Sequence, residues 1–266
     1  MKQLLKQMIK ATGLSRQSVA ETRLHLERHA MAALPRTRKR RHGRILAYHS
    51  VGQPEFGVND VPPPLFRQQI EQALDWGYRF VPADDIANGH GGEMDLAITF
   101  DDGLRSVASA AAPVLAEHDI PWTLFVVTSW SDGQDDWSRP RVLNWSELAD
   151  LARAGAQLGS HSVTHPDFSK ISNAQARDEL FRSREMFEDN LGFTPTTFAI
   201  PYGQSGNWTP QAGELAHEAG YDIVYAQAED TRPDDTIART FVTRSDSTPV
   251  FRALLDGVYD QWEEWF

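Results

Sequence analysis

Between residues 45 and 243, short apolar runs alternate with longer stretches that repeat apolar residues at helical spacing. This alternation is typical of βα units, and a series of such units builds a parallel sheet. The candidate strands are Ile45–Tyr48, Tyr78–Val81, Leu96–Phe100, Trp122–Val127, Ala156–Gly159, Thr197–Ile200, Asp222–Ala226 and Thr240–Thr243. The candidate helices are Pro64–Trp76, Leu104–His118, Trp145–Ala154, Asn173–Leu191 and Pro210–Ala219. Seven or eight strands within about 220 residues predict a closed or nearly closed β/α barrel.

Polar residues and residues with special backbone preferences stand directly after several of these strands. They are His49 after Tyr48, Asp101-Asp102 after Phe100, Ser160-His161 after Gly159, and Pro201-Tyr202-Gly203 after Ile200. Parallel α/β folds build their active sites at the carboxyl ends of the strands. The pattern therefore indicates an enzyme.

The pair Asp101-Asp102 lies at a strand-to-loop junction, where neighbouring side chains point in different directions. One carboxylate can bind a cation while the other remains free to act as a base. Taken alone the pair is a weak signal, because Asp and Gly are also common at helix N-caps and in turns.

His161 and His165 are four residues apart, so both imidazoles can face one metal from a helical turn or a tight loop. A carboxylate from another strand end would complete a His₂-carboxylate set with open positions for water and substrate. Such sets are typical of catalytic zinc, and cobalt, nickel and iron accept the same ligands. We therefore expect a divalent metal, with zinc as the first candidate.

Proline and glycine flank Tyr202 in the third motif, Pro201-Tyr202-Gly203. They impose an unusual backbone path, which can expose a main-chain N–H as an oxyanion donor. A simple turn after a strand is the alternative interpretation.

In this order, and each at a strand end, the three motifs resemble those of the polysaccharide deacetylases with a NodB homology domain, the carbohydrate esterase family 4-like proteins. The resemblance extends from about Ile45 to Ser245. It includes Tyr48-His49-Ser50-Val51, Phe80-Val81-Pro82 and Trp145-Ser146-Glu147-Leu148. It implies a distorted (β/α)₇-type barrel and the metal-dependent hydrolysis of N-acetyl, less often O-acetyl, groups from amino-sugar glycans.

The resemblance also implies roles for individual residues. Asp101 corresponds to the general base, and Asp102, His161 and His165 correspond to the metal ligands. The backbone N–H of Tyr202 corresponds to the oxyanion donor.

Two departures from the family pattern concern catalytic groups. Many members take their general acid from a histidine in a C-terminal Leu-x-His motif, but no histidine follows His217 here. His49 is the expected substitute, since the Tyr-His opening resembles the exopolysaccharide-associated branch of the family. Many members also hold the base with an arginine at the position of Ala199, and Arg239 or Arg244 is the candidate replacement.

Substrate contacts are expected from Pro201, Trp208 and Arg239. Trp137, Trp145 and Trp208 are candidate sugar platforms, although tryptophans in such loops are as often packing residues.

Residues 1–44 differ in composition from the rest of the chain. They contain twelve Lys and Arg against Glu21 and Glu27, whereas the remainder contains 14 basic and 35 acidic residues. We expect a basic N-terminal extension and linker over 1–44, with Pro35–Arg44 exposed, and a catalytic domain over 45–266. The alternative is that residues 1–44 are a solvated tail without a binding function.

The extension is also the candidate contact with other molecules. Leu4, Leu5, Met8 and Ile9 form an apolar helical face, so docking to an anionic membrane surface or to a polysaccharide-synthesis partner is a candidate function beside the solvated tail, and no nucleic acid is expected. The apolar residues near the N-terminus are too interrupted for a signal peptide, and no stretch reaches the roughly 20 apolar residues of a membrane span. The expected location is cytoplasmic or membrane-peripheral.

Two other functions fit the residues. One is a small-molecule amide or cyclic-imide hydrolase on the same fold, and the other is a non-catalytic glycan-binding subunit. The chain has no cysteine, which excludes disulfides and thiolate metal sites.

Overall fold

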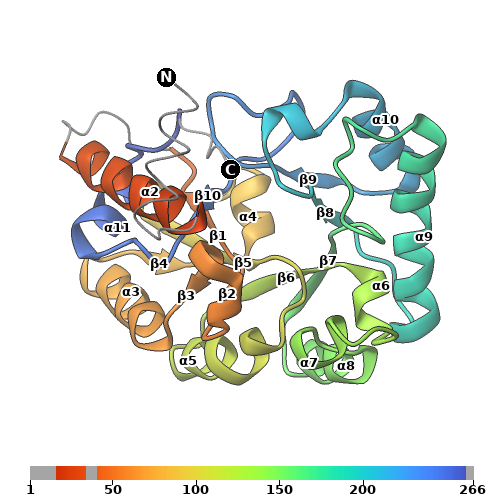
Figure 1. Cartoon of the computed structure of the whole chain (residues 1–266), viewed down its shortest axis with the longest axis horizontal. Helices are drawn as coiled ribbons and strands as arrows, with labels where there is room; N and C mark the ends of the chain where they lie inside the picture. Colours follow the sequence, from red (N-terminus) through yellow and green to blue (C-terminus); the bar gives the residue numbers. More distant parts are fainter. Residues whose placement is uncertain (1–15, 34–40, 262–266) are drawn as a thin grey trace.

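The computed structural model describes residues 16–33 and 41–261. Within these residues, eight strands form one sheet in which all strand pairs are parallel (Figure 1). Its main path runs β10-β1-β5-β6-β7-β8-β9, and β4 pairs with β5 beside it. The strands are β1 (Arg44–Tyr48), β4 (Arg79–Phe80), β5 (Asp95–Phe100), β6 (Trp122–Val126), β7 (Gln157–Ser160), β8 (Thr197–Ala199), β9 (Ile223–Tyr225) and β10 (Thr240–Phe241).

The segment just before β10 joins the two ends of this path. Ile237 donates its backbone N–H to Val224 (2.8 Å) and accepts from Ala226 (2.8 Å), and Arg239 donates to Ala226 (3.1 Å). Since β10 pairs with β1 on its other side, the sheet curls into a distorted barrel of β/α type. The predicted fold class is confirmed. A small separate ladder joins β2 (Ser50–Val51) to β3 (Asp60–Val61).

Helices surround the sheet (Figure 1). They are α2 (Arg16–Ala32), α3 (Pro63–Asp75), α4 (Ala83–Ala87), α5 (Ala112–Glu117), α6 (Thr128–Ser131), α7 (Ser138–Arg141), α8 (Trp145–Arg153), α9 (Asn173–Leu191), α10 (Pro210–Ala219) and α11 (Thr248–Leu255). Shorter helical turns are η1 (Pro54–Asn59), η2 (Val107–Ala111) and η3 (Ser205–Asn207).

Two helices have the bounds that the sequence predicts, because their ends are specified locally. Helix α9 begins after a capping box in which Ser172 and Gln175 satisfy each other's backbone N–H groups, and it ends at Gly192 with φ 75°. Helix α10 begins at Pro210 behind the Thr209 cap and ends at Gly220 with φ 95°. The predicted helix Leu104–His118 is shorter and is split between η2 and α5.

The basic segment contributes helix α2, which packs against α11 on one side of the barrel (Figure 1). Its Arg28 is 1% exposed and forms a bidentate pair with Asp246. The prediction of an exposed linker is wrong for its last residues: Gly43 is buried, and Arg44 begins β1 and pairs with Asp260 (2.6 Å). Gly43 has φ 90°, and a side chain there would meet the carbonyl of Asp95. Residues 34–40, and the apolar face from Leu4 to Ile9, lie outside the described residues.

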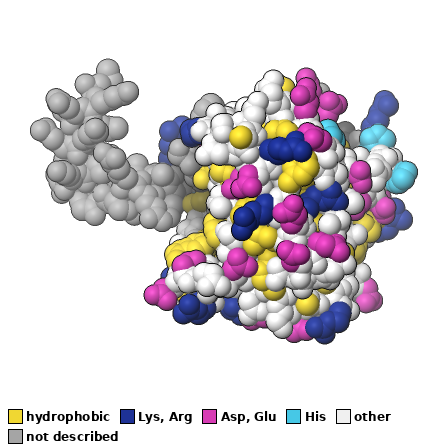
Figure 2. Space-filling model, turned by 90° about the vertical axis from the view of Figure 1, so that its right-hand side faces the viewer, with side chains coloured by type: hydrophobic (Ala, Val, Ile, Leu, Met, Phe, Trp, Pro, Cys, Tyr) yellow, Lys and Arg dark blue, Asp and Glu magenta, His cyan; other side chains and the backbone are white. Residues whose placement is uncertain are grey.

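The opposite face, formed by α9 and α10, carries acidic and basic side chains interspersed, without a large area of one sign (Figure 2). Of the helices that the structure describes, none combines the length and the apolar character required to cross a membrane.

Candidate metal centre and active site

The polar residues after four strands meet at one end of the barrel. Asp101 and Asp102 follow β5, His161 follows β7, Tyr202 follows β8 and His49 follows β1. Parallel strands bring their carboxyl ends to the same edge, so residues far apart in the chain converge there.

Asp102, His161 and His165 form a cluster of potential metal ligands whose donor atoms all lie within 4.8 Å of one another. Oδ1 of Asp102 is 3.7 Å from Nε2 of His161 and 3.6 Å from Nε2 of His165. This oxygen is buried and has no hydrogen-bond partner. Ligand atoms of a tetrahedral zinc lie about 3.3 Å apart. The cluster therefore fits a divalent cation.

The two imidazoles have the charge state that metal coordination requires. Nδ1 of His161 lies 2.7 Å from the carbonyl of Ala199, which fixes the proton on Nδ1 and leaves the Nε2 lone pair facing Asp102. Burial lowers the pKa of His161 to about 3 and also lowers the pKa of His165, so both rings are neutral. Burial raises the pKa of Asp102 to about 6, and a bound cation would favour its ionised form.

His165 reaches the cluster through a tight loop, not through a helical turn. Ser162 and His165 both have positive φ values of 70° and 60°, and the Ser162 hydroxyl accepts from the His165 backbone N–H (2.9 Å). Glu179 on α9 accepts from the backbone N–H groups of Val163 (2.8 Å) and Thr164 (2.9 Å). This carboxylate holds the loop in shape, and no local sequence signal indicates it.

Asp101 is paired with Arg239 in the buried floor of the site. The guanidinium donates from Nη1 to Oδ1 (2.6 Å) and from Nη2 to Oδ2 (2.8 Å). Burial alone would raise the pKa of Asp101, but the charge and hydrogen bonds of the Arg239 guanidinium outweigh it and hold this pKa well below its usual range. Arg244 points elsewhere, to the carbonyl of Gly57. Of the two candidate arginines, Arg239 is the one that pairs with Asp101.

His49 and Tyr202 border the open side of the site. The His49 ring lies edge-on to Phe241 (5.2 Å), and its buried Nδ1 has no hydrogen-bond partner. Tyr202 has φ 64°, and within the described residues its backbone N–H donates to no protein acceptor. The exposed Tyr202 ring contacts His165 (4.7 Å).

A cavity of about 480 Å³ opens beside these residues. Its lining includes His49, Asp102, His165 and Tyr202, together with Asn59, Asp167, Lys170, Gln204, Asn207, Gln227 and Phe241. This volume lies within the usual range of small-molecule sites.

The predicted substrate contacts are not all at this cavity. Trp208 is 7% exposed, packs on Phe168 and Phe198, and lines a different cavity of about 560 Å³. The Arg239 side chain is fully buried against Asp101. It therefore contacts this carboxylate and is not exposed to the cavity. Pro201 is buried, whereas its neighbour Tyr202 is exposed.

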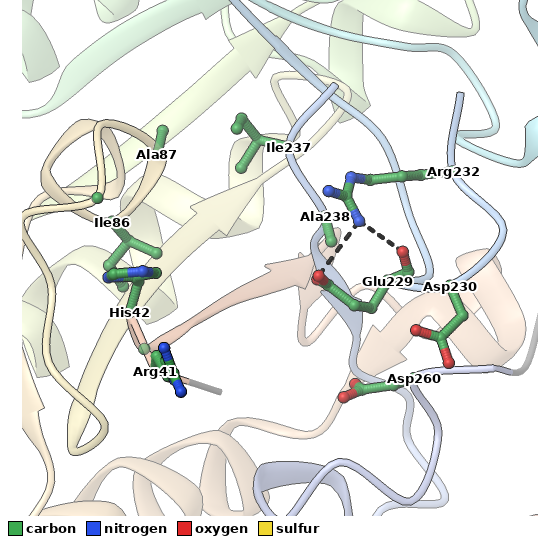
Figure 3. A pocket seen from close by; sticks show the side chains of 12 residues that line it. Arg41, His42, Ile86, Ala87, Glu229, Asp230, Arg232, Ile237, Ala238 and Asp260 are labelled. Carbon is green, nitrogen blue, oxygen red and sulfur yellow. Dashed lines mark hydrogen bonds and ion pairs between the residues drawn. The ribbon is translucent and has the colours of Figure 1, made fainter. Parts of the chain in front are cut away.

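A second hollow, of about 370 Å³, lies near the start of β1 (Figure 3). Arg41 and His42 line one side of it, and across from them Arg232 forms an ion pair with Glu229 (3.2 Å). None of the three candidate metal ligands borders it. We therefore assign the chemistry to the cavity beside Asp102.

Comparison with known proteins gives one consistent result. A profile of the polysaccharide deacetylase family matches residues 88–224, just over half of the chain. The chain is 30% identical over 130 residues to the peptidoglycan-N-acetylglucosamine deacetylase PgdA of Listeria monocytogenes, covering 48% of this chain and 24% of that protein. It is 28% identical over 151 residues to the chitooligosaccharide deacetylase of Bradyrhizobium sp., covering 55% of this chain and 63% of that protein.

Solved structures show the same fold. The deacetylase PplD of Streptococcus pyogenes superposes with a TM-score of 0.68 at 21% identity, covering 80% of this chain and 96% of that one. IcaB from Ammonifex degensii gives a TM-score of 0.67 at 22% identity, covering 82% and 98%. The chain spans about a quarter of the length of the first curated relatives that it matches.

Proposed function

Because the chain belongs to the polysaccharide deacetylase family, we propose that it is a metal-dependent hydrolase that removes acetyl groups, chiefly N-acetyl groups, from an amino-sugar polysaccharide or oligosaccharide. The observation that carries the proposal is the juxtaposition of an ionised carboxylate, Asp101, with the cluster of Asp102, His161 and His165.

The three ligands would hold a divalent cation, with zinc as the first candidate and cobalt, nickel or iron as alternatives. When bound, the cation supplies a Lewis acid that polarises the acetyl carbonyl and lowers the pKa of water. Asp102 provides the anionic ligand and the two neutral imidazoles provide the others.

The remaining steps use the protein's own groups. Asp101 accepts a proton from the attacking water, whose oxygen bonds to the acetyl carbon. The backbone N–H of Tyr202 donates to the oxyanion that develops there. His49 delivers a proton to the amine nitrogen as the carbon–nitrogen bond breaks, which releases acetate and the free amino sugar.

The basic segment supports a second, separate proposal. We propose that residues 1–15, with Leu4, Leu5, Met8 and Ile9, attach the enzyme to an anionic membrane surface or a polysaccharide-synthesis partner. Deletion of residues 1–15 is the proper test, because it spares α2 and its buried Arg28. Unchanged binding to vesicles of anionic lipid after this deletion would refute membrane attachment.

The deacetylase is tested by measuring metal content and acetate release from N-acetylglucosamine oligomers for the wild type and Asp101→Asn. We expect about one equivalent of metal in both proteins, and roughly a 10²–10⁴-fold lower rate in the variant, the usual contribution of a general base. Asp136→Asn, which changes a fully exposed carboxylate, is the matched control.

Two results would contradict the proposal. Metal without acetate release from any oligomer would indicate a different substrate, and small amides and cyclic imides would be assayed next. Failure to bind zinc, cobalt, nickel or iron would overturn the metal-dependent mechanism.

A further inference from the structure

A row of aromatic rings leads away from the candidate metal centre. Trp130 stacks on the ring of His165 (5.6 Å between centroids, 26° between planes), and Trp137 meets Trp130 at 5.0 Å. Phe56 on η1 then contacts Trp137 at 6.3 Å. We call Trp130, Trp137 and Phe56 the aromatic row. It connects a metal ligand with η1, whose last residue, Asn59, lines the site cavity.

The row is partly open to solvent. Trp137 is 43% exposed, whereas Trp208 and Trp122 are 7% and 8% exposed. Exposure of a large aromatic side chain costs free energy, and contiguous exposed apolar side chains commonly mark a binding surface. The exposed Tyr202 ring also contacts His165 (4.7 Å), so His165 touches aromatic rings from two separate loops.

Trp137 is also held in position before any ligand arrives. Its backbone N–H and that of Ser138 both donate to Oδ1 of Asp135 (2.8 Å each). The Arg141 guanidinium lies 5.9 Å from the Trp137 ring centroid, and Arg141 pairs with Glu55 (3.7 Å). A ring fixed in this way loses little conformational entropy when it binds a partner.

We propose that the aromatic row is a sugar subsite, in which the exposed face of Trp137 stacks on the pyranose ring next to the unit that is being deacetylated. This inference rests on the proposed function, because it assumes that an acetylated amino sugar occupies the cavity beside Asp102. A pyranose has an apolar face of C–H groups and a polar rim of hydroxyls. A flat, rigid, exposed indole complements that apolar face, and the continuity of the row with His165 makes the neighbouring unit of the same chain the occupant.

The subsite predicts how the enzyme selects its substrate. An oligomer long enough to reach Trp137 gains binding energy that a single N-acetylglucosamine cannot gain. KM should therefore fall with chain length in the wild type. This dependence separates a polymer deacetylase from a hydrolase of small amides.

The test compares Trp137→Ala with the wild type on N-acetylglucosamine oligomers of one to five units. We expect KM for the pentamer to rise about tenfold while kcat stays within about twofold, the pattern of lost uniform binding. The KM and kcat for single N-acetylglucosamine should not change in this variant. Trp137→Phe keeps a smaller ring, so its KM for the pentamer should lie between the values of the wild type and Trp137→Ala.

Phe193→Ala is the matched control, because Phe193 is 37% exposed in the turn between α9 and β8. It should keep the wild-type dependence on chain length. A Trp137→Ala enzyme that still prefers the pentamer as the wild type does would overturn the subsite.

A binding measurement separates this inference from the proposed function. Calorimetric titration of the pentamer into chelator-treated protein does not depend on turnover. If no protein releases acetate but wild type binds the pentamer about tenfold more tightly than Trp137→Ala, the proposed activity fails and the subsite stands. Equal binding by the two proteins, or no binding by either, would exclude the subsite.

Discussion

Two buried arginine–aspartate pairs in this barrel look alike and have different surroundings. Arg28 binds Asp246 with contacts of 2.6 and 2.7 Å, and Arg239 binds Asp101 with contacts of 2.6 and 2.8 Å. In both pairs the side chains are at most 4% exposed. Distance and burial alone do not distinguish them.

The difference lies in what else each carboxylate contacts. Both oxygens of Asp246 also accept from Thr243, one from its backbone N–H (2.9 Å) and one from its hydroxyl (3.0 Å). Within the described residues, Arg239 is the one protein donor to the oxygens of Asp101. Asp246 is therefore saturated, whereas Asp101 retains lone pairs for a water molecule. The open side of Asp101 is what its proposed role as general base requires, whereas the four contacts of Asp246 fit a purely structural role.

The largest effect is expected for Arg28→Met. Removing one partner of a buried pair leaves an uncompensated charge, so the free energy of unfolding should fall by about 3–5 kcal/mol. Denaturant unfolding measures this loss. Turnover per folded molecule should stay unchanged. A fall in turnover at equal folded fraction would show instead that Arg28 also positions His49, because Arg28 donates to the carbonyl of Phe241, whose ring contacts His49.

Arg239→Met, the matched variant in the other pair, should also lose stability, so turnover is compared per folded, metal-loaded molecule. We expect that turnover to fall about 100-fold, equivalent to about 2.7 kcal/mol, because Asp101 loses the charge that keeps it ionised and oriented. Initial rates of acetate release at saturating oligomer measure the change. Wild-type turnover would mean that the pair is merely structural.

Arg239→Lys should have a smaller effect, about tenfold in turnover, or about 1.4 kcal/mol. Lysine preserves the charge but cannot reproduce the two parallel hydrogen bonds of the guanidinium. The same kinetic assay applies. If lysine and methionine are equally damaging, geometry matters more than charge at this position.

The smallest effect is expected for Arg23→Ala on the exposed side of α2. Arg23 pairs with Glu27 at 2.6 Å, but its side chain is 68% exposed. Such helix-surface pairs contribute about 0.3–0.5 kcal/mol. Denaturant unfolding of Arg23→Ala and Arg28→Met compares an exposed with a buried arginine in the same helix. A fall in the free energy of unfolding of Arg23→Ala by more than about 1 kcal/mol would contradict the comparison.

Local patterns predicted much of the fold and of the candidate metal centre. The strand ends were predictable because apolar runs stop where polar residues begin, and α9 and α10 because their caps are specified by neighbouring residues. The strand-end pattern joined His161 and His165 to a carboxylate of the Asp101-Asp102 pair, and the family resemblance identified Asp102 as the ligand.

The features that the sequence did not predict depend on contacts between residues that lie far apart in the chain. Arg239 lies 138 residues from Asp101, so the sequence offered two candidate arginines and no means to choose between them. The loop context of Trp208 in the sequence does not reveal that its ring packs on Phe168 instead of lining the cavity beside Asp102. Glu179 acts 15 residues away from Thr164, and helix α11 is too short for a clear period.

The pairing of Arg28 with Asp246 has a consequence for biosynthesis. The two residues are 218 positions apart, and chains grow at about 5–20 residues per second, so Asp246 is added roughly 10–45 s after Arg28. Helix α2 must emerge from the ribosome and remain without its partner while nearly all of the barrel is translated. Helix α2, one of the first elements to be made, therefore cannot dock onto α11 in its final form until almost the whole chain has been synthesised.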